Sequence, residues 1–315
     1  MSRYFLALLV LLVPATVFAQ KPPKERAKPP VFNQAEIDST FFPDLFNGNV
    51  LVGSRPQNLS VSATPNVQTP VPNGNSPAAS PSAAGRWTDI ISATTIEDEV
   101  KALKLKVDAD VTTPTQFASR GYKRCRKNFS TLALMFAIAG EYDGDVRWKE
   151  DAPGARDLFY RSAQNSKVGT SQAYNEAKLR KQDLQDLVGG AAFSGKEGTP
   201  AADWSQVADR SPLMQRLVSG FDDRLKPMLA SQSEFKENSE TVFHEAEIVA
   251  AISEALMQQG MPDGEDEDYK AFCKQMKEAA RSIADAVKLD NYSQASSAAG
   301  DISKACSECH EIYRG

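Results

Sequence analysis

The chain has very little cysteine and histidine, with 4 Cys and 2 His in 315 residues. This excludes zinc-finger arrays, which need four such ligands for each metal, and disulfide-dense scaffolds. It also excludes proteins that carry many covalently bound haem groups. An excess of positive charge is absent too, because 36 Lys and Arg are set against 41 Asp and Glu, for a net charge of −5. Since a nucleic-acid-binding protein needs a basic surface, we expect no nucleic-acid partner.

No apolar run reaches the length of about 20 residues that a membrane-spanning helix requires. The longest run, over residues 4–18, follows a positive charge at Arg3 and ends beside the small residue Ala19. These features predict a signal peptide over residues 1–19 with Gln20 as the mature N-terminus, and an uncleaved anchor is the alternative. We therefore expect an exported, for example periplasmic, protein with no membrane span in the mature chain.

Proline is concentrated near the N-terminus, where residues 20–86 hold 11 of the 18 prolines. Such a composition buries too little apolar surface to offset the entropy of ordering, which predicts a flexible linker. One apolar segment at residues 41–52 interrupts it. We expect this segment to dock on the folded part, and a short recognition segment is the alternative.

From Trp87 onward, helical periodicity dominates and predicts an all-α fold. One apolar stripe at alternating steps of three and four comprises Tyr292, Ala295, Ala299, Ile302, Cys306, Cys309 and Tyr313. Residues 269–287 show the same rhythm, and Asp290 or Asn291 can cap the helix that follows. Further helices are predicted over residues 235–259 and 211–229, the latter distorted or ended by Pro227. Four helices with short connections predict an antiparallel bundle.

The preceding part of the chain repeats this pattern weakly. Trp87 and Trp204 open the two halves, and similar residues recur at offsets of 114 to 120 positions. This indicates a tandem duplication, with one four-helix bundle over residues 87–195 and another over residues 204–315. The alternative is that two Ala- and Leu-rich helix sets align by coincidence.

The strongest motif is Cys306-Ser307-Glu308-Cys309-His310, the C-x-x-C-H signature of c-type haem attachment. Residues three and four apart share one face of a helix, so Cys306 and Cys309 can both reach the vinyl groups of one haem. His310 follows on that face and can ligate the iron. A redox-active dithiol is one alternative, although such pairs normally lie at a helix N-terminus. A zinc site is another, for which only Cys125, Cys273 and His244 remain as further ligands.

A C-x-x-C-H motif in the last helix of an exported four-helix bundle, continued as His310-Glu311-Ile312-Tyr313-Arg314, resembles the cytochrome c′ family. The resemblance covers about the last 100 residues in helix count and motif position. It implies a haem protein with His310 as the proximal iron ligand and with Tyr313 and Arg314 near the proximal side. It further implies that a side chain of the first helix of the bundle covers the distal side. The candidates for this role are Met214, Leu217, Phe221 and Leu225.

The two halves differ at the motif. In the first half, the duplication aligns Val188-Gly189-Gly190-Ala191-Ala192 with the C-x-x-C-H residues. Because this segment has neither thiol nor imidazole, we expect one covalent haem c per chain. The haem-free half can then take the place of the second subunit of a dimer, although a dimer of whole chains is also compatible with the sequence.

These patterns predict an electron-transfer protein with an unidentified redox partner, and not an enzyme. If an apolar side chain covers the iron, binding or sensing of a diatomic gas such as NO or CO is the alternative. Ligation by Met214 would instead give a low-spin electron carrier, since thioether ligation raises the potential. His244 is a further candidate for distal ligation. We expect Cys125 and Cys273 to be buried thiols, with a disulfide between them as the alternative.

Overall fold

The computed structural model describes residues 86–193, 195, 198–199 and 201–314. The predicted signal peptide, the predicted linker up to residue 85 and its apolar segment lie outside these residues. All regular elements of the described part are helical, which confirms the all-α prediction. Among the described helices, none is both long enough and apolar enough to cross a membrane.

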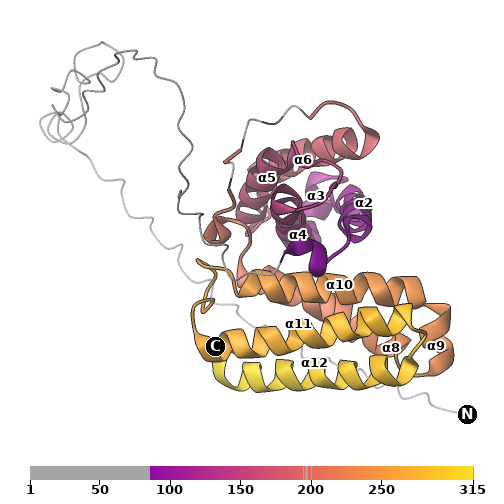
Figure 1. Cartoon of the computed structure of the whole chain (residues 1–315). Coiled ribbons are helices and arrows are strands. Elements are labelled where there is room, and N and C mark those ends of the chain that lie inside the picture. The colour runs from indigo at the N-terminus through magenta and orange to yellow at the C-terminus, as the bar shows by residue number, and fades with distance from the viewer. Residues whose placement is uncertain (1–85, 194, 196–197, 200, 315) are drawn as a thin grey trace, which may run out of the picture. The chain divides into compact units, whose positions relative to one another are not determined.

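Two series of helices follow one another along the chain (Figure 1). The N-terminal series consists of η1 (Trp87–Asp89), α2 (Ala93–Asp110), α3 (Pro114–Gln116), η2 (Phe117–Gly121), α4 (Tyr122–Glu141), α5 (Ala152–Asn165) and α6 (Ser171–Gly189). The C-terminal series consists of η3 (Trp204–Gln206), α7 (Arg210–Leu217), η4 (Val218–Leu225), α8 (Lys226–Met228), α9 (Gln232–Glu237), α10 (Ser239–Leu256), α11 (Glu267–Lys288) and α12 (Tyr292–Tyr313). In the C-terminal series α10, α11 and α12 pack side by side.

The helices that carry the C-terminal motif begin and end at the expected signals. The Asp266 side chain caps α11 by accepting hydrogen bonds from the backbone N–H groups of Asp268 and Tyr269. Asn291 caps α12 in the same way, as predicted, by accepting from the Gln294 N–H. The predicted stripe of α12 faces inward, with Ala295 and Ile302 fully buried. These two helices therefore confirm the predictions made from periodicity.

The helix predicted over residues 235–259 is wrong in its boundaries, because the structure divides it into α9 and α10. The break lies at Asn238, whose side-chain amide donates to the Glu234 carbonyl at 2.8 Å. A side chain that bonds to nearby backbone in this way competes with the helix.

The helix predicted over residues 211–229 is continuous but irregular. Its central part, η4, is a π-helix, and the chain leaves the helix at Met228, directly after Pro227. Proline lacks an N–H and its ring disfavours continued α-helix around it, so the predicted distortion is confirmed. The π-helix is wider than an α-helix, which changes which side chains of this segment face α10 and α12.

Candidate functional site

The C-terminal series encloses a cavity of about 260 Å³ among α7, η4, α10, α11 and α12. Most of its walls are apolar side chains. Its lining comprises Met214, Leu217, Val218, Phe221, Asp222, Lys226, Val249, Phe272, Cys273, Met276, Ile302, Ser303, Ala305, Cys306, Ser307, Cys309 and His310. We refer to it as the thiol cavity, because three of the four cysteines of the chain line it.

The residues of the C-x-x-C-H motif lie in the last turns of α12, and both cysteines and the histidine line the thiol cavity. Cys306 and Cys309 are half-buried, whereas His310 is more exposed. The Cys306 Sγ lies 3.8 Å from the Met276 Sδ of α11. The helix thus presents two thiols and one imidazole to the same apolar space.

Both motif thiols are held in their neutral form. Burial, followed by the nearby carboxylate of Asp222, raises the pKa of Cys306 to about 11. Burial also raises the pKa of Cys309. The thiols lie at the C-terminal end of their helix, where the helix dipole disfavours a thiolate. A redox-active dithiol needs a lowered thiol pKa, so this environment disfavours that alternative.

Three of the four predicted distal residues line the thiol cavity: Met214, Leu217 and Phe221. Leu225, the fourth candidate, is fully buried and does not line the cavity. Phe272 and Met276 of α11 also line the cavity, and sequence reasoning placed them only in the helix stripe. Their place on the apolar stripe of α11 was the signal from which a position in the cavity could have been predicted.

A second, more polar hollow of about 800 Å³ lies on the other side of Cys309 and His310. We refer to it as the polar hollow. It is lined by Lys127, Arg210, Ser211, Met214, Gln215, Val218, Ser219, Asp222, Tyr269, Cys309, His310, Tyr313 and Arg314. Met214 and His310 belong to both linings, so the two spaces adjoin at the motif.

Tyr313 and Arg314 line the polar hollow together with His310. The Tyr313 hydroxyl donates to the Asp266 Oδ1 at 2.6 Å. This hydrogen bond raises the pKa of Tyr313 to about 12 and lowers the pKa of Asp266. The contact ties the end of α12 to the N-cap of α11, which fixes the helix end that carries the motif.

The remaining cysteines are both free buried thiols, as the sequence predicted. Burial is the main cause that raises the pKa of both Cys125 and Cys273 to about 12. Cys273 lines the thiol cavity beside Cys306 and Cys309, a position that sequence reasoning missed. Cys125 and Cys273 are 148 positions apart in sequence and belong to different helix series.

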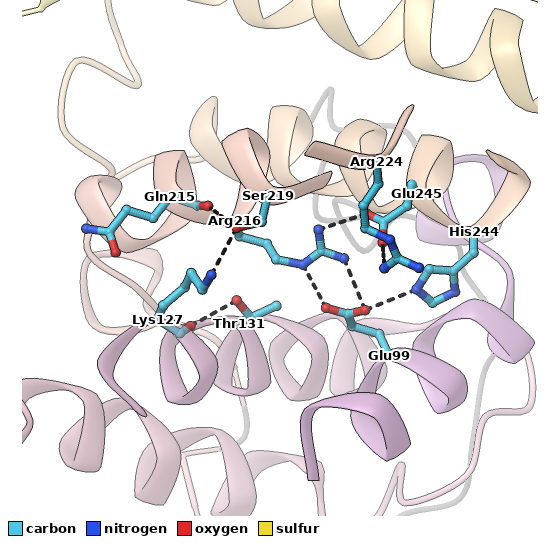
Figure 2. Close-up of polar contacts among 9 residues, drawn as sticks. All are labelled: Glu99, Lys127, Thr131, Gln215, Arg216, Ser219, Arg224, His244 and Glu245. Atoms are coloured by element: carbon cyan, nitrogen blue, oxygen red, sulfur yellow. Dashed lines mark hydrogen bonds and ion pairs between the residues drawn. The ribbon is translucent and has the colours of Figure 1, made fainter. Parts of the chain in front are cut away.

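His244 does not line either space. Its Nε2 lies 3.0 Å from the Glu99 Oε2, at one end of a buried ionic network (Figure 2). Arg216 forms the centre of this network and binds Glu99 through Nε at 2.8 Å and Nη2 at 3.1 Å. Its Nη1 binds the Glu245 Oε2 at 2.8 Å, and Arg224 binds the other oxygen of Glu245. The network joins α2 of the N-terminal series to α7, η4 and α10.

Arg216 also connects this network to the thiol cavity, because Met214 and Leu217 of the same helix line that cavity. Burial alone would raise the pKa of Glu99, but Arg216 and the hydrogen bond with His244 hold it well below its usual range. The carboxylate and guanidinium are therefore both charged at neutral pH, and their pairing fixes the orientation of α7.

Gly220 of the π-helix is required by this network. A Cβ at this position would lie 2.6 Å from both the Arg216 Nη1 and the Glu245 Oε2. We expect Gly220→Ala to destabilise the protein by about 1–3 kcal/mol, the usual cost of overpacking, in denaturant unfolding. Gly300→Ala is the matched control, because nothing lies within 4 Å of its Cβ position in α12. There the helix propensity of alanine predicts a gain of about 0.5–1 kcal/mol, and equal effects at both positions would contradict the steric argument.

Comparison with known proteins adds no relative: no protein-family model, no curated protein and no solved structure matches the chain.

Proposed function

We propose that the protein is an exported c-type cytochrome that binds one haem c in the thiol cavity and transfers electrons. The observation that carries the proposal is the placement of Cys306, Cys309 and His310 on one face of α12, lining an apolar cavity. A motif that matched by chance would not be expected to line a space walled by several other helical segments.

The residues present fit a covalently attached haem. Apolar side chains wall the cavity, which suits a porphyrin face, and the sulfurs of Cys306 and Cys309 come from one helix face. Both sulfurs are neutral thiols at neutral pH, the form whose S–H adds across a vinyl group to give a thioether. When bound, haem supplies a one-electron ferric–ferrous couple or a site for a small gas. His310 holds the iron, while Leu217, Phe221 and Met276 exclude water.

We further propose that the two helix series are tandem four-helix bundles that arose by duplication. Each series opens with a short 3-10 helix that begins at a tryptophan, Trp87 in η1 and Trp204 in η3. Residues at equivalent positions contact each other across the series. Trp87 and Trp204, which are 117 residues apart, stack at 5.6 Å between ring centroids. Glu99 and Arg216, which form the central ion pair, have the same separation of 117 residues.

Contacts at the starts of the first helices are also reciprocal. Ser92, the N-cap of α2, bonds through both its N–H and its hydroxyl to Glu247 of α10. Asp209, the N-cap of α7, accepts a hydrogen bond from Arg126 of α4 at 2.8 Å. Each first helix thus begins on the second long helix of the other series. A two-fold arrangement of this kind is that of a homodimer interface, which supports an N-terminal half standing in for a second subunit.

The N-terminal series lacks what haem attachment requires. Helix α6 ends at Gly189, and Gly190 takes a left-handed conformation with φ of 80°. The segment aligned with the C-x-x-C-H motif therefore leaves the helix, in addition to lacking thiols. In the core of this series Phe129, Phe136 and Phe159 stack at 5.5 to 6.0 Å between ring centroids. Aromatic side chains thus fill the interior of this series.

Optical spectra of the purified protein test the proposal in three states: ferric, ferrous, and ferrous with carbon monoxide. We expect a c-type haem spectrum and, by intact mass, one haem per mature chain. A high-spin ferrous protein that binds carbon monoxide readily would favour the gas-binding alternative, with an apolar residue over the iron. A sharp low-spin band that is indifferent to carbon monoxide would favour electron transfer with Met214 as the sixth ligand. Absence of a haem band, or two haems per chain, would contradict the proposal.

Met214 is favoured over His244 as a sixth ligand, because only Met214 lines the cavity. In the low-spin case, Met214→Leu removes the thioether and is expected to convert the spectrum to high spin. His244→Gln retains a side chain that can bond to Glu99 and is expected to leave the spin state unchanged.

A further inference from the structure

The N-terminal series contributes one side chain to the surroundings of the proposed haem site. Lys127 lies on α4, yet it lines the polar hollow together with His310 and Met214 of the C-terminal series. Its Nζ donates to the Ser219 Oγ of η4 at 2.9 Å (Figure 2). The motif-free half of the chain therefore places an ammonium group beside the iron-ligand candidate.

Lys127 forms no ion pair with a carboxylate of the described residues, although Asp222 lines the same hollow. Its side-chain hydrogen bond there is to a neutral hydroxyl. Arg210, another cation of the polar hollow, differs because it is paired with Asp263. Burial, together with the cations Lys106 and Arg216, lowers the pKa of Lys127 by more than the carboxylates of Asp223 and Asp110 raise it. A half-buried ammonium in such surroundings favours the entry of a negatively charged group.

We infer that the polar hollow receives a carboxylate group of the bound haem, with Lys127 as its cation. The inference rests on the proposed function and deepens it. Haem carries two carboxylates on one edge, and the polar hollow adjoins the thiol cavity at Cys309 and His310. The haem site is then composite, and the motif-free half of the chain completes it.

The midpoint potential of the holoprotein tests this inference. We expect Lys127→Met to lower the potential, because losing a nearby positive charge favours ferric over ferrous haem. An effect of about three- to tenfold on the reduction equilibrium corresponds to about 30–60 mV at 59 mV per tenfold. Lys127→Arg keeps the charge and is expected to restore the potential. Lys123→Met is the control, since Lys123 lies exposed on the same helix and does not line the hollow.

Three outcomes would overturn the inference. An unchanged potential in Lys127→Met, with haem attached, would show that the lysine does not face a haem carboxylate. An equal shift in Lys123→Met would reduce the effect to general surface charge. A saturable response of the wild-type potential to sodium acetate at constant ionic strength, lost in Lys127→Met, would assign the hollow to a free carboxylate instead. Failure of the proposed function is separate from these, because the wild-type protein would then show no haem band at all.

Discussion

The double substitution Cys306→Ala/Cys309→Ala is expected to remove all covalently bound haem. Both thiols line the thiol cavity from one face of α12, and without them no sulfur remains in position to form either thioether. The intact mass of the exported protein should equal that of the mature polypeptide, and the visible spectrum should lose its haem bands after denaturing gel filtration. Each single substitution leaves one thioether site and is expected to lower the haem content without abolishing it.

The chain provides its own controls for this experiment. Cys125→Ala changes a buried thiol of the N-terminal series and is expected to leave haem content unchanged. Cys273→Ala is the sharper control, because Cys273 lines the same cavity as the motif but lies on α11. Haem that remains covalently bound in the double variant would contradict the assignment of the motif. Loss of haem in the Cys273→Ala variant would instead show that lining the cavity matters more than the spacing of the motif.

Helix identity could be predicted from the sequence because it depends on local signals. The period of α11 and α12, and caps such as Asn291, are present in the sequence and the structure follows them. The errors arise where the helix is not a regular α-helix. Leu225 is four residues from Phe221 and should share its face, but the intervening backbone is a π-helix. Leu225 is fully buried but does not line the cavity, and nothing in the apolar pattern marks that difference.

The candidate site was predictable only where one helix carries it. Cys306, Cys309 and His310 were found because their spacing along a single helix is the motif itself. Lys127 lines the same site from a helix more than 180 residues away in sequence, and its spacing carries no such signal. Glu99 and Arg216 likewise belong to no motif. Their pairing depends on how the two helix series pack, which periodicity does not encode.

Glu99→Gln is expected to destabilise the folded protein by about 3–5 kcal/mol at neutral pH. Both partners are deeply buried, with 1% of the Glu99 side chain and 3% of the Arg216 side chain exposed. The substitution leaves two guanidinium groups facing a single carboxylate, and an unmatched buried charge is costly. Denaturant unfolding of the holoprotein measures the loss. Glu308→Gln is the control, because its pair with Lys304 is exposed and long at 3.9 Å and should contribute about 0–0.5 kcal/mol.

The same pair predicts how stability depends on pH. Arg216 and His244 hold the pKa of Glu99 below its ordinary value of 4.5, so the pair stabilises the folded state fully above that pH. The contribution declines as the pH falls below 4.5, because the unfolded chain then binds a proton that the folded chain excludes. The difference in unfolding free energy between wild type and Glu99→Gln should therefore narrow between pH 5 and pH 3. A constant difference over this range would contradict a charged Glu99.

A double-mutant cycle separates the pair from its surroundings. Arg216→Met alone leaves Glu99 without its main partner, whereas Glu99→Leu/Arg216→Met removes both charges and leaves Glu245 paired with Arg224. We expect the double variant to be more stable than either single variant, because an apolar replacement avoids the unmatched charge. Met214 and Leu217 lie on α7 together with Arg216 and line the thiol cavity. The haem spectrum of the double variant therefore reports whether the pair also positions α7 beside the haem. A stable double variant with an altered spin state would show that the network positions α7 over the haem, whereas an unchanged spectrum would confine the network to stability.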